Sequence, residues 1–296
     1  MTDQQSAWRF TDDRGQSAAA ARRPSRVLAY VQAGATLEDF GIRPEGIFGS
    51  GHDGPEPDRA KTGALPLDAV DYRGAGDGLD VETLLRGGPD LVVAVSYGHG
   101  QIYGLDPDTA KRLEERVPVV VIDVGQARTL DRVTDRFAEL ARSLGGTPDP
   151  AAGRTLEEAR ARLTRALAAA GEEGPRVVAL SPAGQGEVHL ARPHMWPELR
   201  VLAGLGVRLV APGEGPGINW STGGWDRAAA LRPDIVLTDI RSNAVPLDGI
   251  EDPGWAPVRG GAHTVAWNPE PLCSPQAHAR FLRLVADAVE EAARTD

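Results

Sequence analysis

The sequence has little cysteine and no long apolar stretch, and both features exclude classes of protein. Cys273 is the single cysteine among 296 residues, so the chain forms no internal disulfide bond and no zinc site built from cysteines. No run approaches the roughly 18 apolar residues that cross a membrane. Residues 1–16 are polar and carry no apolar run of the kind found in a secretory signal. As it stands, the chain is expected in the cytoplasm, and a chain whose leader has been removed would instead be expected in the cell envelope.

Basic residues are also in deficit. The chain has 32 Lys and Arg against 42 Asp and Glu, a net charge of -10, which excludes sequence-independent nucleic-acid binding because such binding needs clustered cations. Hydrophobic residues make up 41% and charged residues 25%, which is the balance of a folded globular chain and not of a disordered one. The length is sufficient for two domains of ordinary size or for one large domain.

Short apolar runs alternate with helix patterns in the first half of the chain. The predicted buried strands are residues 26–30, 46–49, 91–95 and 119–122. The predicted helices are residues 36–40, 80–86 and 106–116. Asp80 is the expected N-cap of the second helix, and Gly87 is its stop. Strands that alternate with helices indicate a parallel sheet covered by helices.

The second half of the chain repeats this plan. Residues 226–237 overlay residues 82–93 at an offset of 144, with an acid at the helix start and a Pro-Asp pair before the strand in both copies. The strand pattern at 176–180 matches that at 26–30 at an offset of 150. Agreement of acid, helix, Pro-Asp and strand predicts two similar lobes.

Between the halves lies a helix pattern without a counterpart in the repeat. Thr129 can cap this helix, and apolar residues at 130, 133, 137 and 140 fall on one of its faces. We therefore predict an α/β fold of two Rossmann-like lobes with mainly parallel sheets, joined by one long connecting helix. The predicted divisions are a polar N-terminal lead-in at 1–25, an N-terminal lobe at 26–126, the connecting helix at 127–146 and a C-terminal lobe at 147–296.

Several short motifs follow one another in a characteristic order. They are residues 10–16 (FTDDRGQ), 24–27 (PSRV), 36–41 (TLEDFG), 79–85 (LDVETLL) with 89–93 (PDLVV), 141–146 (ARSLGG) and 255–261 (WAPVRGG). In order and spacing they resemble the helical-backbone class of periplasmic binding proteins, which deliver siderophores and vitamin B12 to ABC importers. The resemblance covers residues 10–291. It implies a monomeric binding protein, not an enzyme, with a small-molecule metal chelate as ligand and an ABC permease dimer as partner.

Aromatic and cationic side chains gather in the loops that follow the predicted strands. Ligands of open parallel sheets bind beyond the carboxyl ends of the strands, so these loops are expected to line a cleft between the lobes. The predicted ligand-binding residues are His52, Tyr72, Arg73, Tyr97, His99, Tyr103, Arg192, His194, Trp196, Trp220, Trp225 and Arg241. Trp8, Trp255 and Trp267 are predicted to be packing residues.

Within the family, the chain most resembles the ferric-hydroxamate binders. The resemblance implies that Arg73, Tyr97 (or Tyr103) and Trp220 contact the ligand. Arginine and tyrosine can donate hydrogen bonds to the oxygens around hydroxamate-bound iron, and flat aromatic rings can pack against the linkers. The resemblance implies no intrinsic cofactor, because the iron is carried within the bound siderophore.

Two acidic residues at helix starts have two alternative interpretations. The resemblance implies that Glu82 and Asp226, at matching helix starts in the two lobes, dock the chain on arginines of the permease. The alternative is that both are acids favoured at a helix N-terminus by the helix dipole.

Some residues would also suit other functions. Histidines 52, 99, 189 and 194 would suit direct binding of zinc or manganese, which related proteins achieve with three histidines and a carboxylate. Residues 49–54 match G-x-G-x-x-G, but Pro55 and Pro57 cannot open the helix that holds a pyrophosphate, so a loop is predicted. The sequence has no G-x-S-x-G, H-E-x-x-H or P-loop motif. An intracellular binder of a chelate or another small natural product, without a role in transport, remains a further alternative.

Overall fold

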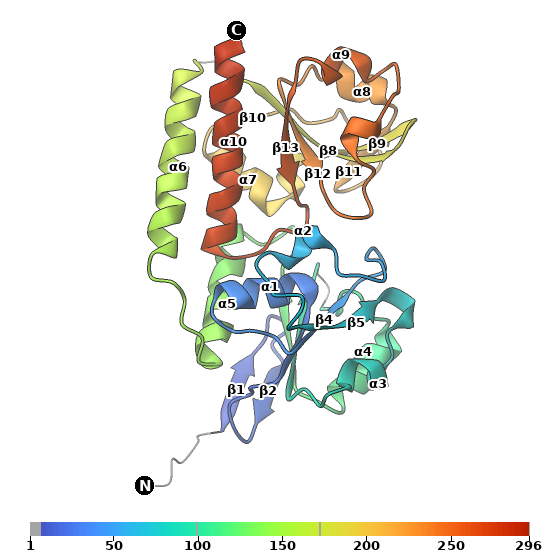
Figure 1. Cartoon of the computed structure of the whole chain (residues 1–296), viewed down its shortest axis with the longest axis vertical. Coiled ribbons are helices and arrows are strands. Elements are labelled where there is room, and N and C mark those ends of the chain that lie inside the picture. The colour runs from blue at the N-terminus through green and yellow to red at the C-terminus, as the bar shows by residue number, and fades with distance from the viewer. Residues whose placement is uncertain (1–6, 99, 172, 296) are drawn as a thin grey trace. The chain divides into compact units, whose positions relative to one another are not determined.

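The computed structural model describes residues 7–98, 100–171 and 173–295, and the chain divides into two compact units (Figure 1). Unit 1 comprises Met1–Ala152 and Leu272–Ser274, and unit 2 comprises Gly153–Pro271 and Pro275–Asp296. Each unit has its own sheet and its own core. Over the described part of the chain, no helix combines the length and the apolar character needed to span a membrane.

Unit 1 is built on a five-stranded sheet in which every neighbouring pair is parallel. In spatial order its strands are β5 (Asp71–Ala75), β4 (Gly46–Gly49), β3 (Val27–Tyr30), β6 (Leu91–Ser96) and β7 (Val119–Asp123). All residues of β3, β4 and β6 are buried, as expected for strands covered on both faces. The strands predicted from apolar runs are therefore confirmed.

Helices cover both faces of this sheet (Figure 1). The helices of unit 1 are α1 (Val31–Asp39), α2 (Arg59–Thr62), η1 (Gly76–Gly78), α3 (Val81–Leu85), α4 (Pro107–Glu114) and α5 (Leu130–Ser143). Asp80 caps α3 by accepting a hydrogen bond from Thr83 N at 2.7 Å, and Thr129 caps α5 by accepting one from Arg132 N at 3.3 Å. Both predicted caps are confirmed.

Helix α1 begins at Val31, five residues before the predicted start. In the structure Gly34 lies inside α1, where a Cβ would lie 2.9 Å from Cγ2 of Ile47 in β4. The glycine therefore permits a close approach of helix to sheet and does not end the helix.

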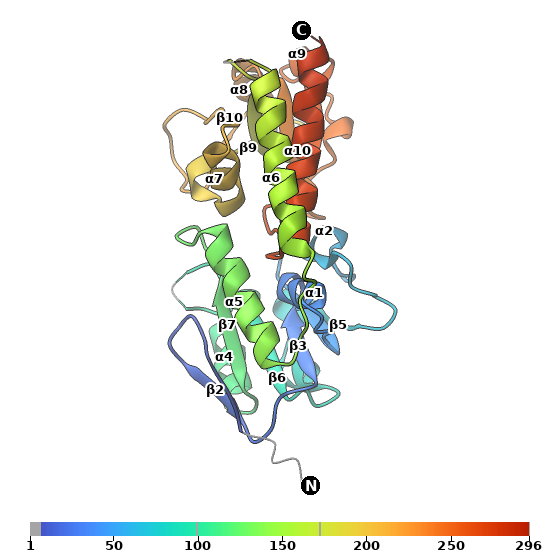
Figure 2. The ribbon, with the colours of Figure 1, turned by 90° about the vertical axis from the view of Figure 1, so that its left-hand side faces the viewer.

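The segment interpreted as a polar lead-in carries a β-hairpin that the sequence analysis missed (Figure 2). Its antiparallel strands are β1 (Trp8–Thr11) and β2 (Ser17–Ala20). Asp12 holds the turn by accepting hydrogen bonds from Arg14 N and Gln16 N. Asp13 ties the turn to β7 by accepting from Asp123 N at 2.9 Å. The hairpin is therefore anchored by partners distant in sequence.

Unit 2 has a six-stranded mixed sheet. Its main path is β11 (Trp220–Gly223), β9 (Glu187–Ala191), β8 (Arg176–Gly184), β12 (Ile235–Asp239) and β13 (His263–Trp267), with β10 (Arg208–Leu209) paired beside the start of β8. Strand β9 is antiparallel to both of its neighbours, and the other pairs are parallel. With the parallel sheet of unit 1, this confirms the predicted α/β fold with mainly parallel sheets.

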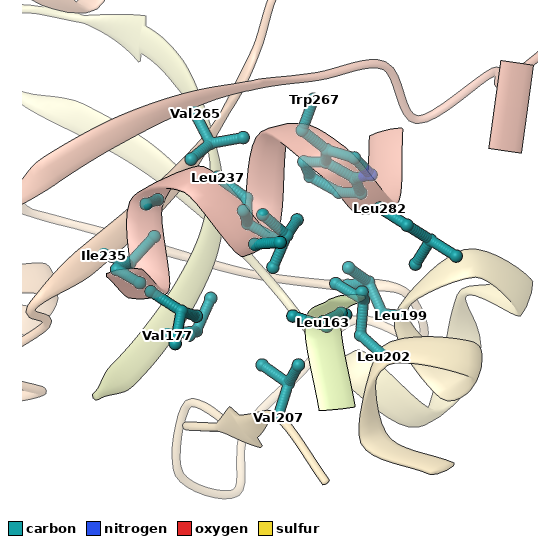
Figure 3. Close-up of a cluster of buried hydrophobic side chains, with 14 of the residues drawn as sticks. Leu163, Val177, Leu199, Leu202, Val207, Ile235, Leu237, Val265, Trp267 and Leu282 are labelled. Carbon is teal, nitrogen blue, oxygen red and sulfur yellow. The ribbon is translucent and has the colours of Figure 1, made fainter. Parts of the chain in front are cut away.

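Alternate residues of the unit 2 strands enter two cores. Val177 and Leu237 face the first core with residues of α6 (Ala152–Ala169), α7 (Pro197–Gly204) and α10 (Pro275–Thr295), as Figure 3 shows in part. Val178 and Val236 face the second core with residues of α8 (Trp225–Ala230) and α9 (Ala256–Arg259). The unit also contains η2 (Pro193–Met195) and η3 (Leu247–Gly249). The alternation follows from the two-residue period of a strand.

The predicted repeat is confirmed at the level of hydrogen bonds. Asp90 precedes β6 and accepts a hydrogen bond from Arg26 N at 2.8 Å, and Asp234 precedes β12 and accepts from Arg176 N at 2.7 Å. In both units the aspartate of the Pro-Asp pair thus holds the amino end of the neighbouring strand.

The helix predicted to connect the lobes is α5. Its apolar face is buried, and the structure places it within unit 1. The chain passes from unit 1 to unit 2 at Ala152–Gly153, at the start of α6, and briefly returns to unit 1 at Leu272–Ser274. Within that return Cys273 is buried, and its N–H donates to Thr36 Oγ1 at 3.1 Å.

Candidate functional site

Aromatic side chains gather at the carboxyl ends of the unit 1 strands. Tyr30 ends β3, and Tyr97 follows β6 directly. Tyr103 returns to β6, where its N–H donates to Val95 O at 2.9 Å. Ring centroids lie 4.7 Å apart for Tyr97 and Tyr103 and 5.5 Å apart for Tyr103 and Tyr30, with edge-to-face geometry. Because Tyr30 is fully buried, it supports the two half-buried rings, and the structure brings the predicted contacts Tyr97 and Tyr103 together.

The loop after β4 is fixed by a buried ion pair. Lys61 Nζ lies 3.0 Å from Asp53 Oδ1, with side-chain exposures of 0% and 1%. Asp53 Oδ2 accepts hydrogen bonds from Ser50 N at 2.7 Å and from Ser50 Oγ at 3.0 Å. The predicted loop is confirmed, and His52 is exposed within it.

Tyr72 on β5 holds the same loop. Its hydroxyl donates to Gly54 O at 3.1 Å. Burial, together with the carboxylates of Asp53 and Asp58, raises the pKa of Tyr72 to about 12. Tyr72 therefore stays protonated as a hydrogen-bond donor at physiological pH.

Arg73 points away from this aromatic group. Its Nη1 lies 2.6 Å from Asp71 Oδ2, and a Cβ on Gly46 would lie 3.1 Å from its Nε. Asp71 and Gly46 are the first residues of β5 and β4, so the guanidinium lies toward the amino ends of the strands. The structure does not bring Arg73 together with Tyr97 and Tyr103.

A pocket of about 460 Å³ opens beside the end of β6 and is one feature that the sequence analysis missed. Ser96, Asp123 and Arg128 line it together with residues of the hairpin turn. Asp123 pairs with Arg128 Nε at 2.8 Å. The motif at 10–16 was the available signal, because it supplies the turn residues of this pocket.

Unit 2 carries a tryptophan cluster made of Trp196, Trp220 and Trp267. The ring centroid of Trp220 lies 4.8 Å from that of Trp196 and 5.8 Å from that of Trp267. The ring centroids of Trp196 and Trp267 lie 5.5 Å apart. Trp196 and Trp267 are buried, while Trp220 is partly exposed at the start of β11. Trp220 is thus the accessible member of a rigid aromatic group, and Trp267 is confirmed as a packing residue.

Arg192 organises the loop that leads to Trp220. Its Nε, Nη1 and Nη2 donate to the carbonyl oxygens of Gly217, Gly213 and Gly215 at 3.2, 3.3 and 2.9 Å. His194, two residues on, is exposed. The guanidinium therefore spans three carbonyls of one Gly-rich loop.

We expect Arg192→Lys to loosen that loop, because a single ammonium cannot bond three carbonyls in a fork. Hydrogen exchange should become faster by about ten-fold at amides 213–219, while the free energy of unfolding changes little. Arg208→Lys is the matched control, since Arg208 Nη1 donates to a single backbone carbonyl, Glu173 O, and pairs with the carboxylate of the same residue. Unchanged exchange in Arg192→Lys would contradict this role.

Trp225 and Arg241 are held by protein groups. Trp225 is 1% exposed, packs against Trp255 with ring centroids 5.0 Å apart, and donates from Nε1 to Gly184 O at 3.0 Å. Arg241 pairs with Asp239 at 2.8 Å and with Glu270 at 3.0 Å. Burial disfavours the charged guanidinium, but these two carboxylates outweigh it and raise the pKa of Arg241. The structure therefore places Trp225 in a core and Arg241 in a neutralised network.

The two acids proposed for docking lie in equivalent places. Glu82 is in the first turn of α3 and Asp226 is in the first turn of α8, and both are exposed. Glu82 forms an ion pair with Arg116. Within the described ranges Asp226 has no ion-pair partner. Both alternatives for these acids, docking and the helix dipole, stay predictions.

The histidines proposed as metal ligands are only partly described. His99 lies outside the described residues. His52 belongs to unit 1, whereas His189 and His194 belong to unit 2. His189 Nδ1 lies 2.9 Å from Thr222 Oγ1. Counting only residues that the structure describes, no three His, Cys, Asp or Glu side chains gather as a metal site.

No protein-family model matches the sequence, and no curated protein matches it. The fold is similar to the solved structure of DesE, a ferric-siderophore receptor protein from Streptomyces coelicolor, with 27% identity, a TM-score of 0.84, and coverage of 96% of this chain and 98% of that chain. It is also similar to the periplasmic heme-binding protein RhuT from Roseiflexus sp. RS-1 (15% identity, TM-score 0.63, covering 91% and 99%). A third similar structure is the siderophore periplasmic binding protein from the fuscachelin gene cluster of Thermobifida fusca (17% identity, TM-score 0.60, covering 92% and 97%).

These similarities confirm the resemblance to the siderophore class of periplasmic binding proteins. The chain has their fold over nearly its whole length. DesE, at 27% identity, is a receptor protein, so the expectation of a binding protein and not an enzyme is confirmed as well.

Proposed function

We propose that the chain is a solute-binding protein of the cell envelope, which captures an iron-siderophore chelate and delivers it to an ABC importer. The observation that carries the proposal is the similarity to DesE, since it extends over 96% of this chain and 98% of that receptor at 27% identity. The name of that receptor supports the ligand class, and the periplasmic neighbours support the location.

The side chains near the strand ends favour a ferric hydroxamate as the ligand. Tyr97, Tyr103 and Trp220 offer aromatic faces for an apolar linker, and the hydroxyl of Tyr103 is the candidate donor for iron-bound oxygens. The candidate cations are engaged within the protein: Arg241 by two carboxylates and Arg192 by three carbonyls. The carboxylates neutralise Arg241, and the donors of Arg192 are occupied by carbonyls, so neither side chain offers a free fork for an anionic ligand. A hydroxamate chelate lacks the high negative charge of a catecholate chelate.

The proposed mechanism is capture and release without chemistry. The chelate keeps all bonds to its iron, which is cargo and not a cofactor of the protein. The Tyr103 hydroxyl donates a hydrogen bond to a chelate oxygen, and Trp220 packs on the linker. Glu82 and Asp226 then meet cations on the permease, where desolvation would make such pairs stronger than they are in water.

A titration of tryptophan emission tests the ligand class. Ferrioxamine B, a trihydroxamate chelate, should quench emission saturably, because one of the six tryptophans lies partly exposed at the proposed contact. A trianionic ferric triscatecholate should bind at least about ten-fold more weakly. Heme and zinc chloride serve as competitors for the alternative functions. Saturable binding of heme or zinc, with no response to either chelate, would contradict the proposal.

Fractionation of native cells separates the importer from the intracellular alternative. The proposal expects the chain in the envelope fraction. Recovery in the cytosol, in cells that keep their envelope intact, would instead support an intracellular chelate binder.

A further inference from the structure

A buried carboxyl group lies beneath the tryptophan cluster of unit 2. Glu198, in the first turn of α7, is 3% exposed. Its Oε1 accepts a hydrogen bond from Trp267 Nε1 at 3.0 Å. Its Oε2 is buried and finds no hydrogen-bond partner among the residues that the structure describes. A half-satisfied buried carboxyl is costly, so its place here calls for an explanation.

The carboxyl controls the one polar atom of the Trp267 indole. Trp267 lies in the same buried cluster as Leu199, the residue that follows Glu198 on α7 (Figure 3). An indole has a single donor, so the bond from Nε1 to Glu198 fixes the direction of its N–H group, and packing against the neighbouring rings restricts rotation about it. The centroid of the Trp267 ring lies 5.5 Å from that of Trp196 and 5.8 Å from that of Trp220. The orientation of Trp267 therefore determines the surface against which Trp220 packs.

The same carboxyl changes charge near neutral pH. Burial raises the pKa of Glu198 to about 7, against the opposing effects of its own backbone N–H, the Trp267 bond, and the cations Arg200 and Arg241. Arg241 is itself paired with Asp239 and Glu270. Helix α10, which packs against β13, adds the buried His278. His189, with its ring 6.2 Å from that of Trp220, is a further titratable group beside the cluster.

We propose that Glu198 is a positioning residue for the tryptophan cluster, and that its protonation couples chelate affinity to pH. This inference rests on the proposed function only for the chelate. A ligand that covers Trp220 removes water from the exposed side of the cluster, which lowers the polarity around Glu198 and so favours its neutral form. By reciprocity, proton binding at Glu198 strengthens ligand binding. Affinity should therefore be higher at pH 6 than at pH 8, by about three- to ten-fold.

The first test follows the tryptophan indole N–H resonances in the ligand-free chain between pH 5 and pH 9. One indole signal, identified by its absence in Trp267→Phe, should titrate with a midpoint near pH 7. It should not titrate in Glu198→Gln, which keeps an acceptor but no titrating group, and the dispersed spectrum of that variant reports its folding. His278→Gln and His189→Gln are the matched controls and should keep the titration. A titration that survives Glu198→Gln, or that vanishes in either histidine variant, overturns the proposal.

The second test measures the affinity for ferrioxamine B at pH 6 and pH 8. The wild type should bind more tightly at pH 6, and Glu198→Gln should bind equally at both values. Equal affinity of the wild type at both values overturns the coupling and leaves the proposed function intact. Absence of binding at both pH values contradicts the proposed function. The indole titration alone then tests the positioning role.

Discussion

Asp53→Ala is expected to lower the free energy of unfolding by about 3–5 kcal/mol, because it removes one partner of the buried ion pair between Asp53 and Lys61. The side chain of Lys61 is 0% exposed, so water does not reach its ammonium without local opening. The variant also removes the acceptor for Ser50 N and Ser50 Oγ, which close the loop around His52. Urea unfolding should show the transition at a lower midpoint with little change in slope.

Two variants sharpen this result. Glu56→Ala, an exposed acid in the same loop, should change the free energy of unfolding by less than about 0.5 kcal/mol. The double variant Asp53→Leu with Lys61→Met replaces the pair by apolar groups and should be more stable than Asp53→Ala. An Asp53→Ala protein as stable as the wild type would show that the pair does not hold the loop.

Trp220→Ala is expected to weaken the binding of ferrioxamine B by about 30-fold, which corresponds to about 2 kcal/mol. Trp220 is the partly exposed ring of a cluster whose other two members are buried, so the ligand meets a preformed surface. Truncation removes that surface and leaves a cavity above Trp196 and Trp267. Isothermal titration calorimetry is the suitable measurement, because the substitution alters the emission signal itself.

Trp8→Ala is the comparison for this variant. Trp8 is a buried residue of the hairpin in unit 1, with its Nε1 donating to Ser143 Oγ at 3.1 Å. It should cost stability but change the affinity less than about two-fold. Similar losses of affinity in both variants would mean that Trp220 is not a ligand contact.

Much of the fold was predictable because its strands are buried on both faces. Continuous apolar runs such as 91–95 can satisfy neither a half-exposed strand nor a surface helix, and the structure confirms a central strand there. The Pro-Asp repeat was predictable for a different reason. Asp90 and Asp234 perform the same local task in two similar sheets, and this leaves the same letters at the same spacing.

The remaining features depend on partners far away in the sequence. The hairpin at 8–20 looks polar, but Asp13 is bonded to a backbone amide 110 residues later, and Arg136 of α5 pairs with it at 2.7 Å. The direction of Arg73 follows from Asp71 and from the space over Gly46, which no sequence pattern encodes.

The candidate site shows the same division. Tyr97 directly follows a predicted strand, so strand prediction was enough to place it. Trp220 was expected in a loop and instead begins β11, which no apolar run indicated. The burial of Trp225 and the three-carbonyl role of Arg192 required the assembled unit. Glu198 gave no signal at all, because an acid in the first turn of a helix is ordinary until its burial against Trp267 is known.

Native mass spectrometry of the chain mixed with ferrioxamine B tests the central claim most directly. The account predicts one intact chelate per chain, with its iron retained and its mass unaltered after release. It also predicts that a trianionic ferric triscatecholate at the same concentration leaves most of the chain unoccupied. A chain that binds neither chelate, or that releases a stripped or chemically altered one, would contradict the account.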